Sequence, residues 1–148
     1  MNELVVILGW LGVFAPVGLG AIGSAIGVTI AGQAAIGAML ETDSGYGRFV
    51  GVAAIPSSTV IYGIVVMFSL QRAITPENGA ALFGIGFLTG LALAYASIWQ
   101  GKACASAIAA SKSKPEIFGL SLAPAAIVEG FAVFTFVFAL VLAGNITG

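Results

Sequence analysis

The sequence predicts an all-α membrane protein whose four transmembrane helices form two fused, duplicated hairpins. Of the 148 residues, 59% are hydrophobic and only 7% are charged, whereas soluble domains carry about 25% charged residues. Four apolar segments each exceed the roughly 20 residues that a helix needs to cross a bilayer. This composition excludes a soluble enzyme and a nucleic-acid-binding protein. The single Cys and the lack of His exclude a disulfide framework and a metal site built on Cys or His.

The predicted helices alternate with short polar connectors. The apolar segments cover residues 4–40, 49–74, 80–110 and 117–146. The connectors between them cover residues 41–48, 75–79 and 111–116. Because these connectors are so short, neighbouring helices are expected to run antiparallel.

The two halves of the chain resemble each other. The stretch Gly32-Gln-Ala-Ala-Ile-Gly-Ala38 in the first segment aligns with Gly101-Lys-Ala-Cys-Ala-Ser-Ala107 in the third, at an offset of 69. Both halves keep the same orientation because two helices separate them, so duplication of one hairpin explains the pattern. The predicted units are a first hairpin, a connecting loop and a second hairpin, over residues 1–74, 75–79 and 80–148.

The distribution of basic residues predicts the orientation of the chain. The connectors 41–48 and 111–116 contain three Lys or Arg residues, whereas Arg72 is the one basic residue on the side of the termini. Since cytoplasmic loops are enriched in Lys and Arg, loops 41–48 and 111–116 are expected in the cytoplasm and the termini outside it. The short loops favour the plasma membrane of a bacterium.

Glu129 is the only carboxylate inside any predicted span. It lies about eleven residues into the fourth segment, about 16 Å deep at 1.5 Å per residue, near the centre of a hydrocarbon core about 30 Å thick. A charge at that depth costs at least about 2.5–3.5 kcal/mol. Protonation or a bound cation would lower this cost, so Glu129 is predicted to be a functional, ion-carrying group.

Further polar side chains are expected at the depth of Glu129. Four residues of the second segment share one helix face, at spacings i, i+3, i+4 and i+7: Ile55, Ser58, Thr59 and Tyr62. Gln100 lies ten residues before the end of the antiparallel third segment and therefore reaches the same level.

Pro56 adds backbone oxygens to this group. Its ring nitrogen cannot donate a hydrogen bond, so a kink is expected there, with the carbonyl of Val52 freed and its neighbours loosened. Together with the hydroxyls, the amide and the carboxylate, such carbonyls form a set of hard oxygen ligands. The set suits a small alkali cation, and it also suits a hydrogen-bonded, protonated Glu.

Small residues form matching stripes in the first and third segments. The glycines of these stripes are Gly20, Gly23, Gly27, Gly86, Gly90 and Gly101. Such stripes allow helix backbones to approach closely, so these two helices are expected to crowd together. The run Gly18-Leu-Gly-Ala-Ile-Gly23 also matches the dinucleotide-binding glycine pattern, but no strand precedes it, so no nucleotide site is expected.

In combination, these motifs resemble the proteolipid subunit of V-type and A-type rotary ATPases, which is called subunit K in bacteria. The resemblance rests on Pro56-Ser-Ser-Thr-Val-Ile-Tyr-Gly63, Gln100-Gly-Lys102 and Glu129 within two fused hairpins. It implies a membrane rotor ring of identical copies, with the first and third helices inside and the second and fourth outside. The glycine stripes would then pack the inner helices of neighbouring copies into a ring of small circumference. It also implies that Glu129 carries the transported ion.

The resemblance further implies the partners of the chain. A stator membrane subunit with an essential Arg would displace the ion, and a central-stalk subunit would dock on the cytoplasmic loops. ATP hydrolysis or synthesis would take place on other subunits. The chain is therefore expected to be the membrane subunit of an ion-translocating complex rather than an enzyme by itself, and to need no cofactor.

The resemblance leaves the transported cation open between Na⁺ and H⁺. Sodium-binding members of the family are similar at the Ile55 carbonyl, Ser58, Gln100 and Glu129, with Tyr62 as a hydrogen-bond donor to the carboxylate. They commonly carry Gln where this chain has Thr59, whose hydroxyl is expected to ligate directly or through a water. Proton-type members are usually apolar at the positions of Ser58 and Thr59. Na⁺ at the Glu129 site is therefore favoured over H⁺.

A proton-coupled small multidrug transporter with a single membrane carboxylate is the alternative function. Such transporters also have four short helices. However, their acidic residue lies in the first helix and their chains have no fused parallel repeat, so the rotor subunit is the preferred interpretation.

Overall fold

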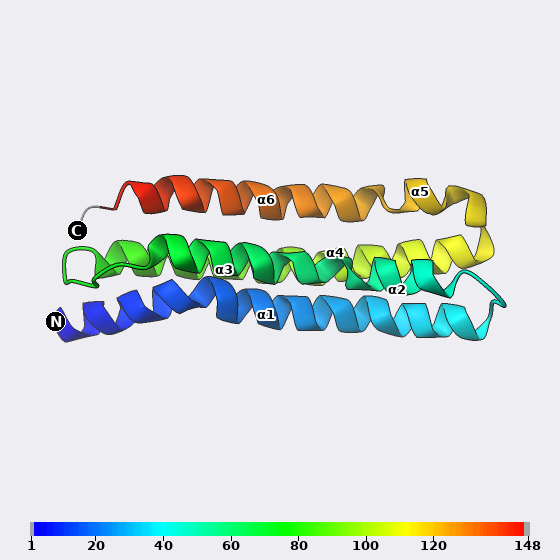
Figure 1. The fold of residues 1–148 in the computed structure, drawn as a ribbon, viewed down its shortest axis with the longest axis horizontal. Helices are drawn as coiled ribbons and strands as arrows, with labels where there is room; N and C mark the ends of the chain where they lie inside the picture. Colours follow the sequence, from blue (N-terminus) through cyan, green and yellow to red (C-terminus); the bar gives the residue numbers. More distant parts are fainter. Residues whose placement is uncertain (1, 147–148) are drawn as a thin grey trace.

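The computed structural model describes residues 2–146 as an elongated bundle of helices (Figure 1). The first and third transmembrane segments are single helices, α1 (Asn2–Leu40) and α4 (Gly79–Ser113). The second is divided into α2 (Tyr46–Ala54), the 3₁₀ turn η1 (Ile55–Ser57) and α3 (Ser58–Leu70). The fourth is divided into η2 (Pro115–Ile117), α5 (Phe118–Ser121) and α6 (Ala123–Gly144). Residues 1, 147 and 148, which end the two predicted hairpins, lie outside the described residues.

Four helical segments of the described chain are long and apolar enough to cross a membrane. They cover residues 2–40, 46–70, 79–113 and 115–144. The prediction of an all-α membrane protein with four transmembrane helices is thereby confirmed. The second segment ends at Leu70 rather than at residue 74, because Gln71 has extended backbone angles (φ −70°, ψ 109°) that cannot continue a helix.

The loop after α3 is held together by the buried side chain of Asn78. Its Nδ2 donates to the carbonyl of Ala73 at 2.9 Å, and its Oδ1 accepts the backbone N–H of Thr75 at 2.9 Å. These bonds satisfy the polar backbone of a tight reversal, which explains why the chain re-enters a helix at Gly79.

Both termini and the loop between α3 and α4 lie at one end of the bundle, and the other two connectors lie at the opposite end (Figure 1). Helix α1 packs most extensively against α4, while α3 packs mainly on α1 and α6 packs mainly on α4. The first and third transmembrane segments therefore form the most closely packed pair, and the second and fourth pack against this pair and against each other.

Glycines allow α1 and α4 to approach closely. A Cβ at Gly86 would overlap with the carbonyl of Gly12, and a Cβ at Gly101 would overlap with the backbone of Gly27. Five of the six stripe glycines lie in this contact within one chain: Gly23, Gly27, Gly86, Gly90 and Gly101. Gly20 instead faces α3, at 3.5 Å from the position of a Cβ to the carbonyl oxygen of Thr59. Packing of these glycines between copies stays a prediction.

Two apolar clusters flank the middle of the bundle. The cluster near the connectors 41–45 and 114 includes Phe49 and Ile108, and the cluster near the termini includes Leu70 and Leu82. All four side chains are fully buried. The buried polar side chains of Ser24, Thr59, Ser97 and Gln100 lie between these clusters, which places the candidate site near the middle of the bundle.

Candidate ion-binding site

The side chain of Glu129 on α6 accepts hydrogen bonds from three uncharged groups. The hydroxyl of Ser58 and the amide Nε2 of Gln100 donate to its Oε2, at 3.0 Å and 2.7 Å. The hydroxyl of Tyr62 donates to its Oε1 at 2.5 Å. Two of the donors come from α3 and one from α4, so residues far apart in the sequence meet on one carboxyl group, as the shared depth predicted.

The predicted kink at Pro56 takes the form of the 3₁₀ turn η1. The carbonyl of Val52, which was expected to be free, accepts the backbone N–H of Ile55, because the tighter turn brings this donor within reach. The carbonyl of Ile55 in turn accepts the N–H of Ser58. The carbonyl of Pro56 accepts the hydroxyl of Ser97 at 2.5 Å, which ties η1 to α4.

A cavity of about 400 Å³ lies beside the carboxyl group. It occurs where the second and fourth transmembrane segments are interrupted. The second is interrupted at η1, and the fourth at Leu122, between α5 and α6. Its lining residues are Ile55, Ser58, Gln100, Leu122, Ala125, Ala126 and Glu129. Ile55 therefore borders the same space as Glu129, together with two of the three donors.

The amide of Gln100 is only partly satisfied. The side chain is 1% exposed, and its Nε2 lies 2.7 Å from Glu129 and 3.3 Å from the carbonyl of Ala125. Among the described residues, its Oε1 is buried and has no hydrogen-bond partner. A buried acceptor without a partner costs about 1–3 kcal/mol of stability. Coordination of a cation or acceptance of a hydrogen bond by this oxygen would recover that cost.

Thr59 lies at the predicted depth, but its hydroxyl is directed away from Glu129. Its Oγ1 is 2.9 Å from Oγ of Ser24 on α1 and 3.5 Å from the carbonyl of Pro56. Consecutive residues of an α-helix are separated by about 100° around the axis. Because Ser58 faces α6, its neighbour Thr59 faces α1 instead. The role of Thr59 as an ion ligand stays a prediction.

Sequence reasoning did not include Phe136 in the site. Its ring stacks on the ring of Tyr62, with a centroid distance of 5.2 Å and an interplanar angle of 28°. Phe136 follows Glu129 by seven residues on the same helix, and this spacing is the signal that could have identified it. Ser24 and Ser97 were also not included, although their hydroxyls bond to the hydroxyl of Thr59 and to the carbonyl of Pro56.

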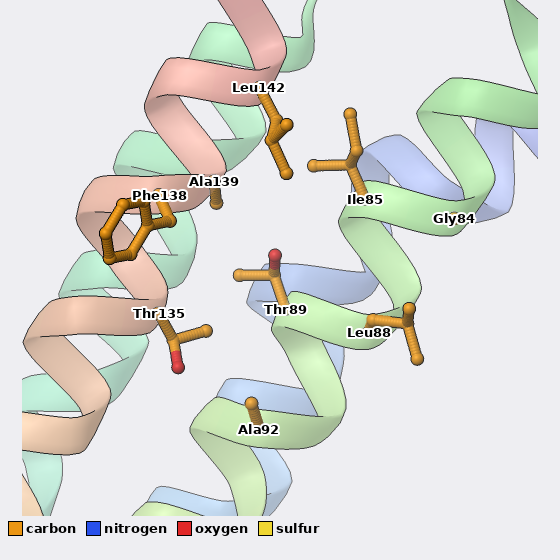
Figure 2. A pocket seen from close by; sticks show the side chains of 9 residues that line it. All are labelled: Gly84, Ile85, Leu88, Thr89, Ala92, Thr135, Phe138, Ala139 and Leu142. Atoms are coloured by element: carbon orange, nitrogen blue, oxygen red, sulfur yellow. The ribbon is translucent and has the colours of Figure 1, made fainter.

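A second cavity, of about 380 Å³, lies between α4 and α6 toward the termini. Figure 2 shows Ile85 and Leu142 pointing toward each other across this gap, with Thr89 below them in this view. The nine lining residues contain two hydroxyl groups and no ionisable side chain. This cavity is therefore a groove for apolar groups, distinct in chemistry from the cavity at Glu129.

Comparisons with known proteins find relatives that match most of the chain and a family model that matches both of its halves. The family model for the ATP synthase C subunit matches the chain twice, over residues 11–70 and 83–142. The A-type ATP synthase subunit K of Methanocaldococcus jannaschii is 32% identical over 123 residues, which cover 80% of this chain and 56% of that protein. The V-type sodium ATPase subunit K of Enterococcus hirae is 28% identical over 128 residues, which cover 84% of this chain and 82% of that protein. The chain thus spans little more than half the length of the first relative and most of the second.

Proposed function

Because the chain belongs to the ATP synthase C subunit family, with matches in both of its halves, we propose that it is an ion-carrying rotor subunit of a V-type or A-type rotary ATPase. Residues 1–74 and 80–148 are its two hairpins, joined by residues 75–79. The multidrug transporter is not supported, since both relatives are named as subunit K of such ATPases. The chain is not an enzyme by itself and works as the membrane part of a translocating complex.

The observation that carries the proposal is the convergence of three donors on Glu129. All three are uncharged, so a bound cation or proton balances the carboxylate at this depth. Because no charged side chain neutralises Glu129 permanently among these partners, its cation or proton can be exchanged, and this suits an ion carrier better than a permanent structural contact. Each copy has one such group, and it lies in the second hairpin.

We assign Na⁺ as the carried ion. The unpaired Oε1 of Gln100 supports this assignment, because rotation of the amide would direct an oxygen rather than a donor toward the carboxyl group. The Ser58 hydroxyl and the Ile55 carbonyl each have a further lone pair, and both residues line the cavity beside Glu129. Similarity to a subunit named for a sodium ATPase adds to this support. The hydroxyl of Thr59 bonds to Ser24, so Thr59 is not assigned as a direct ligand in this proposal.

H⁺ is the second candidate ion, and a specific observation favours it. Ser58 and Tyr62 contact Glu129 through hydroxyl groups, which can accept a hydrogen bond as well as donate one. A protonated Glu129 can therefore donate to one of these hydroxyls while Gln100 remains its donor. At constant pH, sodium is expected to protect Glu129 from carbodiimide labelling if the chain carries Na⁺, and to have no effect on the labelling if it carries H⁺.

The proposed mechanism places the chain in a ring of identical copies that turns within the bilayer. The glycine contacts between α1 and α4 support their position on the narrow inner side, and α3 and α6 then form the outer side. There Glu129 meets a stator subunit, whose Arg displaces the ion. A central-stalk subunit docks on the cytoplasmic loops 41–48 and 111–116, and other subunits hydrolyse or make ATP.

Orientation and location follow from the same proposal. The termini lie outside the cytoplasm of a bacterium, and the ring lies in its plasma membrane. The ion pair between Lys112 and Glu41, at 2.7 Å, joins the ends of α4 and α1 on the proposed stalk-binding side.

The test is ATP-driven ²²Na⁺ uptake into vesicles that contain the complete ATPase complex with this subunit. Glu129→Gln is expected to abolish uptake, because the amide cannot carry the charge that balances a cation. Glu77→Gln, a matched change in an exposed acid of the loop between α3 and α4, is the control and is expected to retain uptake. Sodium-independent proton uptake by the parent complex would assign H⁺ instead, and uptake by Glu129→Gln equal to that of the parent would overturn the proposal.

A further inference from the structure

Phe136 differs from the other phenylalanines near it on α6. Phe131, Phe134 and Phe138 are 62–65% exposed, whereas Phe136 packs against the buried cluster that contains Leu70 and Leu82. Seven residues correspond to about two helical turns, so Phe136 lies on the same face of α6 as Glu129. Its ring therefore lies next to the candidate site, on the side of the termini.

Tyr62 connects this ring to the carboxyl group. The Tyr62 ring stacks on Phe136 at a centroid distance of 5.2 Å, and its hydroxyl donates to Oε1 of Glu129. A tyrosine ring is rigid, so the position of its hydroxyl follows from the orientation of the ring. Contact with Phe136 restricts that orientation, and it does so from the same helix that carries Glu129.

The two oxygens of Glu129 are held differently. Ser58 and Gln100 both donate to Oε2. Among the hydrogen bonds of the described residues, Tyr62 provides the donor to Oε1. Without the Tyr62 hydroxyl, Oε1 loses this donor, while Oε2 keeps two. The carboxyl group then keeps the two contacts to Oε2 and can rotate toward the exposed side of α6, where Phe131 and Phe134 lie.

We propose that Phe136 is a positioning residue: its ring holds the Tyr62 hydroxyl on Glu129 and so sets how readily the carboxyl group leaves its site to exchange an ion. This inference rests on the proposed function, because Phe136 can affect the rate of ion exchange only if Glu129 exchanges an ion. Phe136 itself touches neither the ion nor the carboxyl group and acts through Tyr62.

The test compares rates at which a hydrophobic carbodiimide labels Glu129 in vesicles containing the complete complex, at one pH and without sodium. Phe136→Leu is expected to raise the rate about fivefold, the effect of losing one hydrogen bond of ordinary strength. Phe136→Tyr keeps an aromatic ring and is expected to label at the parent rate. Phe134→Leu, the same change at an exposed position of α6, is the matched control and is also expected to label at the parent rate.

A double variant separates positioning from general loosening of the bundle. Tyr62→Phe alone is expected to raise the labelling rate, and adding Phe136→Leu to it is expected to cause no further rise. Equal rates for Phe136→Leu and the parent would overturn the inference, as would effects that multiply in the double variant. Phe136→Met, with a flexible side chain, replaces Phe136→Leu if that variant does not assemble. Failure of both to assemble would assign Phe136 to core packing and would also overturn the inference.

The outcomes for the proposed function are separate from these. Loss of sodium protection in the parent chain would remove Na⁺ as the carried ion, yet it leaves the comparison of labelling rates among the Phe136 variants intact.

Discussion

The hydroxyls of Ser24 and Thr59 lie 2.9 Å apart in the centre of the bundle. Glu129 follows Thr59 by 70 residues, one more than the offset of 69 that aligns the first and third segments, so Thr59 lies close to the position in the first hairpin that corresponds to Glu129. Both hydroxyls are buried. The first hairpin thus has a pair of neutral groups at this depth, whereas the second hairpin has the carboxyl group of Glu129.

Replacing Ser58 by Ala is expected to weaken sodium binding about tenfold, because a hydrogen bond to a charged group contributes about 1.5 kcal/mol and 1.4 kcal/mol corresponds to a factor of ten. The measurement is the sodium concentration that half-protects Glu129 from carbodiimide labelling. Ser57→Ala removes the neighbouring hydroxyl, which is exposed and bonds to the carbonyl of Ala54, and is expected to leave that concentration unchanged. Equal effects of the two variants would contradict the assignment of Ser58.

Replacing Thr59 by Val is expected to leave sodium protection of Glu129 within about twofold of the parent value, because Val keeps the shape of Thr and the Thr59 hydroxyl bonds to Ser24. The lost bond is expected to lower the stability by about 1 kcal/mol. Titration of sodium protection and thermal unfolding in detergent measure the two effects. A tenfold loss of protection would instead make Thr59 a direct ligand.

Gly86→Ala is expected to destabilise the packing of α1 against α4 by about 1–3 kcal/mol, because its Cβ would overlap with the Gly12 carbonyl and the backbones must separate. Gly84→Ala is the matched control two residues away, where a Cβ meets open space. In a helix interior this second change is expected to be neutral or stabilising. Thermal unfolding of the two variants side by side measures the difference, and equal destabilisation would contradict the close contact at Gly86.

Arg72 joins the ends of α3 and α6. Its guanidinium donates to the carbonyls of Ala143 and Ile146 at the end of α6, and to the carbonyl of Ser69 near the end of α3. Arg72→Lys is expected to cost about 1.5–3 kcal/mol, since an ammonium group cannot reproduce the planar fork that reaches both helices. Lys114→Ala removes an exposed charge of the connector and is the control. Equal decreases in the unfolding temperatures of Arg72→Lys and Lys114→Ala would contradict the role of Arg72 in joining the two helices.

The four helices could be predicted from composition alone, because a long apolar segment in a bilayer has few alternatives to a helix. The depth of Glu129, Ser58 and Gln100 could also be predicted, since it depends only on the rise per residue. The direction of each side chain could not, because it depends on helix rotation. Ser58 and Thr59 are neighbours in the sequence, yet one faces Glu129 and the other faces Ser24.

The helix interruptions were only partly predictable. Pro56 indicated a kink, but the 3₁₀ geometry that satisfies the Val52 carbonyl depends on the contact with Ser97 from another segment. The role of Arg72 was also not apparent, because its partners are backbone carbonyls 71 and 74 residues away in the sequence. Backbone acceptors carry no side-chain pattern that a sequence could reveal.

The proposed function depends on exchange of an ion at Glu129. Carbodiimide labelling of the complete complex, mapped by mass spectrometry with and without sodium at constant pH, measures this exchange. Label is expected on Glu129 and on no other carboxylate of the chain, and it is expected to disappear in millimolar sodium. Absence of label on Glu129 under all conditions, with label on exposed acids such as Glu77 or Glu116, would contradict the proposed function.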